Sequence, residues 1–185
     1  MGKLVVSTFV TLDGVMEAPG GEPSHPHTGW AGDFMGAEEV AFKEAEVREA
    51  GSLLLGRVTY ESFAGAWPGY QGAFADRMNA MPKHVVSATL RDPAWANTTV
   101  LGGDLDAVAA LKARETAPIF VMGSRTLAQA LMERDLVDEY RLMVFPVVLG
   151  SGGRLFPETP RKTTLVHAGI RAFASGVVQH TLSRA

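Results

Sequence analysis

Two short stretches of the chain place a glycine, an arginine and hydroxyl side chains where an apolar run gives way to a helical pattern. They are residues 55–59 (LGRVT) and 122–126 (MGSRT). The first amides of a helix are unpaired and carry partial positive charge, so anions bind there. Glycine lets a ligand approach the backbone, and arginine can contact a phosphate through two N–H groups. The spacing therefore indicates a phosphate site, although ordinary helix capping by the same residue types stays open as an alternative.

Three further features of the sequence could take part in chemistry. Asp13-Gly14 opens a long loop, residues 15–36, which is either a flap over a reacting centre or an ordinary surface loop. His25 and His27 lack neighbouring carboxylate or cysteine ligands, so we expect exposed loop residues and no metal site. The run at 150–154 (GSGGR) resembles part of G-x-G-x-x-G, but a leucine stands at the third glycine position, and this excludes a standard Rossmann site.

Composition narrows the class of protein. The chain has 185 residues, of which 46% are hydrophobic and 20% charged, as in a globular protein of one domain, residues 1–185. It contains no cysteine, which excludes disulfides, thiolate metal sites and cysteine nucleophiles. The net charge of −3 without a basic stripe argues against a nucleic-acid partner. Without a long apolar segment or a signal peptide, we expect a cytoplasmic protein that does not bind membranes.

Short apolar runs alternate with helical patterns along the chain. The alternation predicts a mostly parallel sheet covered by helices on both faces, and the two last strands form an antiparallel hairpin. The expected strands are residues 4–12, 52–55, 84–87, 98–101, 118–122, 138–148, 163–173 and 176–182. The expected helices are residues 38–50, a segment from about residue 59, residues 74–79, and the segments that follow Asp104 and Gly123.

Five stretches, read together, resemble the dihydrofolate reductase superfamily. The likeness is greater to the branch similar to the reductase domain of the bifunctional riboflavin-biosynthesis deaminase–reductase. In chain order the stretches are residues 11–14 (TLDG), 55–62 (LGRVTYES), 121–125 (VMGSR), 136–139 (LVDE) and 146–156 (PVVLGSGGRLF). The resemblance implies a three-layer αβα sandwich with a mixed, mostly parallel sheet and a C-terminal hairpin. It also implies NADPH as the hydride donor and a homodimer.

The resemblance also assigns roles to individual residues. Those expected to bind the cofactor are Gly56, Arg57, Thr59, Ser87, Gly123, Ser124, Arg125, Thr126 and Leu127. Ser87 would lie near the adenosine 2′-phosphate, and the others would hold the remaining phosphates. The expected substrate pocket consists of Val10, Asp13, Trp30 and Tyr60. The candidate catalytic carboxylates are Asp13 and Glu38.

The activity that this likeness implies is NADPH-dependent reduction of a nitrogen heterocycle or a ribosylaminopyrimidine. The model reaction is that of 5-amino-6-(5-phosphoribosylamino)uracil reductase in riboflavin biosynthesis. Reduction of dihydrofolate or a pteridine is an alternative, and so is a non-catalytic, dimeric nucleotide-binding module. Two departures bear on these alternatives: Gly123-Ser124 stands where dihydrofolate reductases have Gly-Gly, and no carboxylate of the first helix aligns cleanly with theirs.

Overall fold

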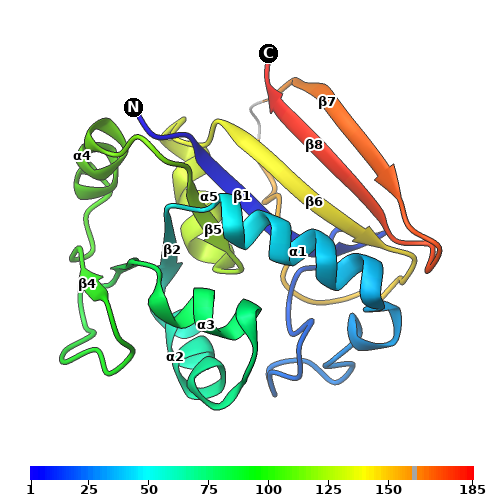
Figure 1. The fold of residues 1–185 in the computed structure, drawn as a ribbon. Coiled ribbons are helices and arrows are strands. Elements are labelled where there is room, and N and C mark those ends of the chain that lie inside the picture. The colour runs from blue at the N-terminus through cyan, green and yellow to red at the C-terminus, as the bar shows by residue number, and fades with distance from the viewer. Residues whose placement is uncertain (160–161) are drawn as a thin grey trace.

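A computed structural model describes residues 1–159 and 162–185, and its centre is one eight-stranded sheet (Figure 1). The strand order is β4-β3-β2-β5-β1-β6-β8-β7. The first six strands in this order are parallel, while β8 runs antiparallel to β6 and β7 antiparallel to β8. The predicted fold class, a mixed and mostly parallel sheet with a C-terminal hairpin, is confirmed. The strands are β1 (Leu4–Thr11), β2 (Ser52–Gly56), β3 (Lys83–Val86), β4 (Thr98–Val100), β5 (Ile119–Met122), β6 (Glu139–Phe145), β7 (Leu165–Ala172) and β8 (Val178–Arg184).

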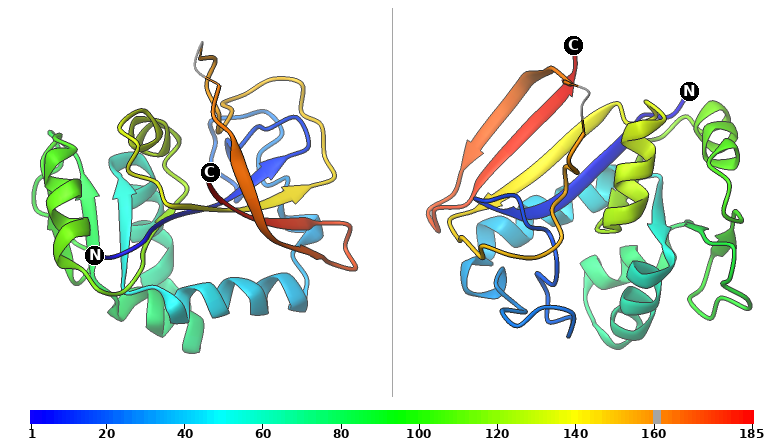
Figure 2. Two further views of the ribbon diagram at one scale, coloured as in Figure 1. Left: turned by 90° about the horizontal axis from the view of Figure 1, so that it is seen from above. Right: turned by 180° about the vertical axis from the view of Figure 1, so that it is seen from behind.

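Helices cover both faces of the sheet, so the molecule has three layers (Figure 2). The helices are α1 (Ala37–Glu49), α2 (Arg57–Ala66), α3 (Ala73–Ala80), α4 (Asp106–Arg114) and α5 (Arg125–Glu133). Alternate residues of the central strands face opposite layers, as the pleat requires. Val5, Leu53 and Phe120 pack with α1, α2 and α3, whereas Leu4 and Leu54 pack with α4 and α5. Two apolar cores therefore hold the helices of the two outer layers against the sheet.

Some boundaries differ from the sequence prediction. The helix expected from about residue 59 already begins at Arg57, so the arginine itself lies in the first turn of α2. The strand expected to reach residue 148 ends at Phe145, because Pro146 follows and the Val147 N–H turns back to the Phe145 carbonyl. Residues 147–149 are thereby released to line a surface depression at the end of β6.

The long loop between β1 and α1 is pinned at several points. Val15 pairs with Arg154 in an isolated bridge, and the Trp30 indole N–H donates to the Glu17 carbonyl at 2.7 Å. A short 3-10 helix, Gly32–Phe34, precedes α1. This loop crosses the carboxyl edge of the sheet, where parallel strands of an open α/β sheet place their ligands.

The described part of the chain offers neither a membrane-spanning helix nor a cluster of metal ligands. None of the helices formed by residues 1–159 and 162–185 has the length and apolarity that crossing a bilayer requires. The same ranges contain no group of three or more histidine, aspartate and glutamate side chains suited to a metal ion.

Candidate functional site

The two glycine-led turns lie side by side. β2 and β5 are neighbours in the sheet, and the Gly56 N–H donates to Ser124 Oγ at 2.8 Å. A Cβ on Gly123 would lie 3.1 Å from the Thr59 methyl carbon, and the φ of Gly123 is +66°, so glycine lets the two turns pack this closely without strain. The starts of α2 and α5 thus form one continuous cradle, which we define as residues 56–59 and 123–127.

Ser124, within this cradle, has a strained backbone conformation. Its φ of 62° and ψ of 59° lie in the left-handed region, which a serine adopts at a cost of about 1 kcal/mol. Its side chain explains why serine is nevertheless found there, because Oγ accepts the Gly56 N–H across the two turns. Strained residues of this kind cluster at ligand sites. All peptide bonds that the structure describes are trans, including the one between Gly123 and Ser124.

Two arginines begin the two helices, and both are about half exposed. The Arg57 Nη1 contacts both carboxylate oxygens of Glu61, at 2.9 and 3.0 Å, one turn further along α2. The Arg125 guanidinium lies across Gly153, where an added Cβ would fall only 1.4 Å from Nη1. Both cations are therefore near the first amides of their helices and accessible to an anion.

A shallow depression of about 260 Å³ continues from the start of α5. Its lining residues are Arg125, Thr126, Gln129, Gly152, Arg154, Phe156, Pro157 and Glu158. Gln129 donates to the carbonyls of Arg154 and Leu155 at 2.9 and 3.2 Å, which fixes the loop that follows β6 against α5. Two arginines against one glutamate make this surface suitable for an anionic ligand.

Glu17, which the sequence did not single out, connects the loop to the cradle. Its carboxylate accepts the Gly153 N–H at 2.7 Å and lies 3.9 Å from Arg125 Nη1. The Gly153 N–H is the main reason that the pKa of this carboxyl lies below its usual value. The sequence gives no local signal that Glu17 reaches the cradle, since Gly153 and Arg125 are both more than a hundred positions away.

Asp13 has a structural task. Its carboxylate accepts the Thr11 hydroxyl at 2.6 Å and the amides of Leu149 and Gly150 at 3.2 and 2.9 Å. These bonds, with the Thr11 hydroxyl first, keep the pKa of Asp13 below its ordinary value, so the group is ionised at neutral pH. A carboxylate held in this way is a hydrogen-bond acceptor, and the predicted catalytic role of Asp13 stays a prediction. Asp13 holds the start of the long loop to the loop after β6.

The first turn of α1 carries one exposed and one buried glutamate. Glu38, the second predicted catalytic carboxylate, is exposed to solvent. Its neighbour Glu39 is buried, accepts the hydroxyl of Ser175 at 2.5 Å and the N–H of Gly36 at 2.9 Å, and has a lowered pKa mainly because of Ser175. Glu39 thereby fixes the entry to α1 and the turn between β7 and β8.

Of the predicted pocket residues, Trp30 lines the surface depression at the end of β6. Tyr60 is buried in the core below α2, and its hydroxyl accepts the Trp95 N–H at 3.0 Å. Val10 is buried in the other core, with Leu127 and Leu131 of α5. The predictions for Val10 and Tyr60 are therefore corrected: the alternation of the strand and the periodicity of the helix direct both side chains inward.

The side chains of Ser87 and His25 both make hydrogen bonds within the fold. The Ser87 hydroxyl accepts the N–H groups of Thr89 and Leu90, at 3.2 and 2.9 Å, and so caps the turn that follows β3 at the carboxyl edge. His27 is exposed as expected, but His25 is buried, with Nε2 3.1 Å from the Ser151 carbonyl oxygen and Nδ1 accepting the His27 N–H. His25 thus joins the long loop to the glycine-rich run at 150–153.

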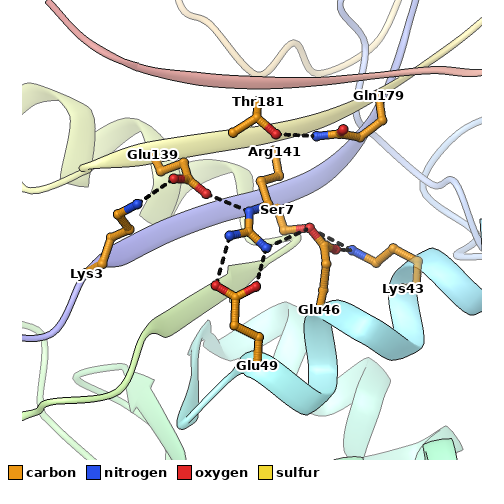
Figure 3. Close-up of polar contacts among 9 residues, drawn as sticks. All are labelled: Lys3, Ser7, Lys43, Glu46, Glu49, Glu139, Arg141, Gln179 and Thr181. Carbon is orange, nitrogen blue, oxygen red and sulfur yellow. Dashed lines mark hydrogen bonds and ion pairs between the residues drawn. The ribbon is translucent and has the colours of Figure 1, made fainter. Parts of the chain in front are cut away.

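A buried network of charges fixes α1 on the sheet (Figure 3). Arg141 of β6 contacts Glu139 at 2.6 Å and Glu49 at 2.6 and 2.9 Å, and lies 3.9 Å from Glu46. Glu46 in turn accepts the Ser7 hydroxyl at 2.7 Å and the Lys43 ammonium at 2.5 Å. Most residues of α1 that are buried are charged, so these pairs replace the apolar stripe that usually holds a helix on a sheet. They determine where the first turn of α1 meets the carboxyl edge.

Comparison with known proteins places this architecture. The RibD C-terminal domain family matches residues 2–179, and the chain belongs to this family. Two curated relatives come from Bacillus subtilis (strain 168). The uncharacterized protein YyaP is 26% identical over 96% of this chain and 92% of its own length, and the uncharacterized protein YwjB is 27% identical over 96% of both chains.

Solved structures support the fold. A protein from Shewanella sp. PV-4 has a TM-score of 0.72 and 20% identity, with 99% of both chains covered. A pyrimidine reductase-like protein from Corynebacterium diphtheriae has a TM-score of 0.70 and 12% identity, with 100% of this chain and 92% of that chain covered. Dihydrofolate reductase from Enterococcus faecalis, solved with NADP(H), has a TM-score of 0.62 and 16% identity, over 99% and 96% of the two chains. The fold is that of dihydrofolate reductase.

Proposed function

We propose that this protein is an NADPH-dependent reductase of a nitrogen heterocycle or of a ribosylaminopyrimidine, the latter in the manner of the riboflavin-pathway reductase. The observation that carries the proposal is the single cradle formed by the starts of α2 and α5, with Gly56 N–H bonded to Ser124 Oγ. Two helix N-termini and two accessible arginines converge on one patch, which suits the several phosphates of a dinucleotide. Membership of the RibD C-terminal domain family supports the same interpretation.

The residues present fit such a cofactor. Gly56, Arg57 and Thr59 would hold one phosphate group, and Gly123, Ser124, Arg125, Thr126 and Leu127 would hold the next. Ser87 directly follows the adjacent β3 at the same edge, in a position suited to the adenosine 2′-phosphate. When bound, NADPH supplies the hydride. The protein contributes position and exclusion of water, since the long loop is pinned across the carboxyl edge by Val15, Glu17 and Trp30.

The decisive test is the Arg57→Ala variant. Losing one charged hydrogen bond costs about 1.5–3 kcal/mol, so the dissociation constant for NADPH should rise roughly 10- to 100-fold. Titration of NADPH fluorescence measures this. Arg48→Ala is the control, because Arg48 is an exposed cation on α1 whose only described ion pair is with Glu44, 3.7 Å away. Equal affinities in Arg57→Ala and the parent would refute the phosphate assignment.

Turnover separates an enzyme from a binding module. Following NADPH oxidation with ribosylaminopyrimidines, dihydropterins and dihydrofolate tests the reductase proposal and its dihydrofolate alternative together. Tight NADPH binding without oxidation by any of these compounds would favour the non-catalytic module.

We also propose that two copies associate through the C-terminal hairpin. β7 is the last strand of the sheet, and among the strands of residues 1–159 and 162–185 it pairs with β8 alone. It exposes Val166 and Ile170 on either side of a β-bulge, and an exposed edge strand with apolar side chains is a template for pairing with another chain. Sedimentation velocity with Ile170→Lys checks this, since a charge at the edge should shift a dimer toward the monomer.

A further inference from the structure

A second depression lies at the carboxyl end of β6, away from the arginines of the cradle. Its volume of about 520 Å³ is large enough for a heterocyclic ring system with a substituent. It lies on the carboxyl edge that also carries the cradle, two strands further along the sheet order from β5 to β6. We call it the aromatic pocket, and its lining residues are His27, Thr28, Gly29, Trp30, Asp33, Phe34, Val147, Val148 and Leu149.

The aromatic walls of this pocket are held firmly. Trp30 and Phe34 both pack edge-to-face on Phe145, with ring centroids 5.3 and 5.9 Å apart and interplanar angles of 82°. The Trp30 indole is fixed further by its bond to the Glu17 carbonyl. Rigid aromatic surfaces next to small residues suit a flat ring more than a flexible chain.

The charges of the pocket have the opposite sign from those of the cradle. Its ionisable lining side chains are Asp33 and His27, and the lining contains neither lysine nor arginine. Arg154 donates to the carbonyl of Asp13, whose carboxylate holds Leu149, but this arginine lines the depression beside the cradle and not the aromatic pocket. A phosphate placed here would face a carboxylate without a cation to balance it, whereas ring N–H groups would find an acceptor.

The two sites share one wall. Glu17 receives the Trp30 indole N–H on its carbonyl, and its carboxylate receives the Gly153 N–H beside Arg125. The chain at Glu17 therefore separates a cationic surface from the aromatic pocket. A polyanionic dinucleotide would find complementary charge on the cationic side of Glu17. A neutral or cationic ring would find it on the side of the aromatic pocket.

We propose that the aromatic pocket takes the substrate, and that this substrate is a flat nitrogen heterocycle without a phosphate group whose ring N–H groups face Asp33. The proposal rests on the proposed reductase function and narrows it, because the riboflavin-pathway reaction that the family likeness suggests has a phosphorylated substrate. The specificity is set by Asp33 and by the absence of a cation among the pocket's lining residues.

The test compares 5-amino-6-ribosylaminouracil with its 5′-phosphate in isothermal titration calorimetry, with and without saturating NADP⁺. We expect the parent protein to bind the unphosphorylated compound at least about 10-fold more tightly, equivalent to about 1.4 kcal/mol. Asp33→Lys should reverse this preference. Glu133→Lys is the matched control, because it makes the same charge change on an exposed residue at the end of α5 and should leave the preference unaltered.

Each outcome bears on the proposal. Tighter binding of the phosphate by the parent, equal effects of Asp33→Lys and Glu133→Lys, or no binding of either compound would overturn it. The NADPH titration of Arg57→Ala is independent, so a protein that binds NADPH normally but fails here disproves the pocket assignment alone. A protein that binds the unphosphorylated ring but not NADPH disproves the proposed reductase and leaves the pocket intact.

Discussion

Gly153 offers a sharp test of how Arg125 is positioned. The guanidinium crosses the α-carbon of Gly153 so closely that a Cβ there would overlap Nη1, at 1.4 Å, and Cζ, at 2.4 Å. The φ of Gly153 is not in the left-handed region, so alanine can adopt the backbone without strain. In Gly153→Ala the methyl group must therefore displace the arginine, while the Glu17 carboxylate keeps its bond to the Gly153 N–H.

The expected loss of NADPH affinity follows from the contact that Arg125 would no longer make. If it contributes one charged hydrogen bond to a phosphate, its displacement costs about 1.5–3 kcal/mol and raises the dissociation constant for NADPH roughly 10- to 100-fold. The free energy of unfolding should change by less than about 1 kcal/mol, because the atoms that move belong to the end of a flexible side chain. Gly153→Ala and Arg125→Ala remove the same contact, so their double variant should be no worse than Arg125→Ala.

NADPH fluorescence titrations of the parent, the two single variants and the double variant form the assay, with urea denaturation for stability. Gly150→Ala is the matched control. Gly150 has a φ of +76°, but a Cβ there meets nothing within 4 Å, so we expect a stability loss of about 1 kcal/mol and unchanged NADPH affinity. Additive losses of affinity in the double variant, or parent-like affinity in Gly153→Ala, would refute the reasoning.

Two predictions concern buried charges. Arg141→Met leaves three carboxylates without their shared cation, so the free energy of unfolding should fall by about 3–5 kcal/mol in urea denaturation. The control Arg48→Met breaks an exposed pair and should lower the free energy of unfolding by less than about 1 kcal/mol. Equal losses would show that the network contributes nothing. Lys83 is fully buried; its ammonium donates to the Asn79 and Ala96 carbonyls at 2.7 and 2.8 Å, and burial lowers its pKa from 10.5 to about 8. Above about pH 8 the folded protein releases a proton that the unfolded chain still holds, so the stability of the parent relative to Lys83→Met should rise by about 2 kcal/mol between about pH 7 and pH 9.5. A flat difference between the two denaturation series would contradict the lowered pKa.

The sequence predicted much of the fold because its signals are local. Short β-branched runs alternate with helical patterns, and each glycine-led turn lies where a strand ends, so the strands and the sites of both turns follow from neighbouring residues. The burial of charged residues in α1 has no local signal of this kind. Glu39, Lys43 and Glu46 have the composition of a solvated face, yet they are buried, because Ser7 and Arg141 come from distant strands to pair with them.

Only the tertiary structure decided how the parts of the site meet. Gly56 and Ser124 are 68 positions apart and contact each other because β2 and β5 are neighbours in the sheet, an order that the chain sequence does not contain. The same holds for Glu17 and Gly153, and for Asp13, whose carboxylate is engaged by amides 136 and 137 positions away. The sequence determined which residues could bind a phosphate or carry a proton. Long-range packing determined which of them remain accessible, since a hydrogen bond made elsewhere in the fold uses the group that a ligand would need.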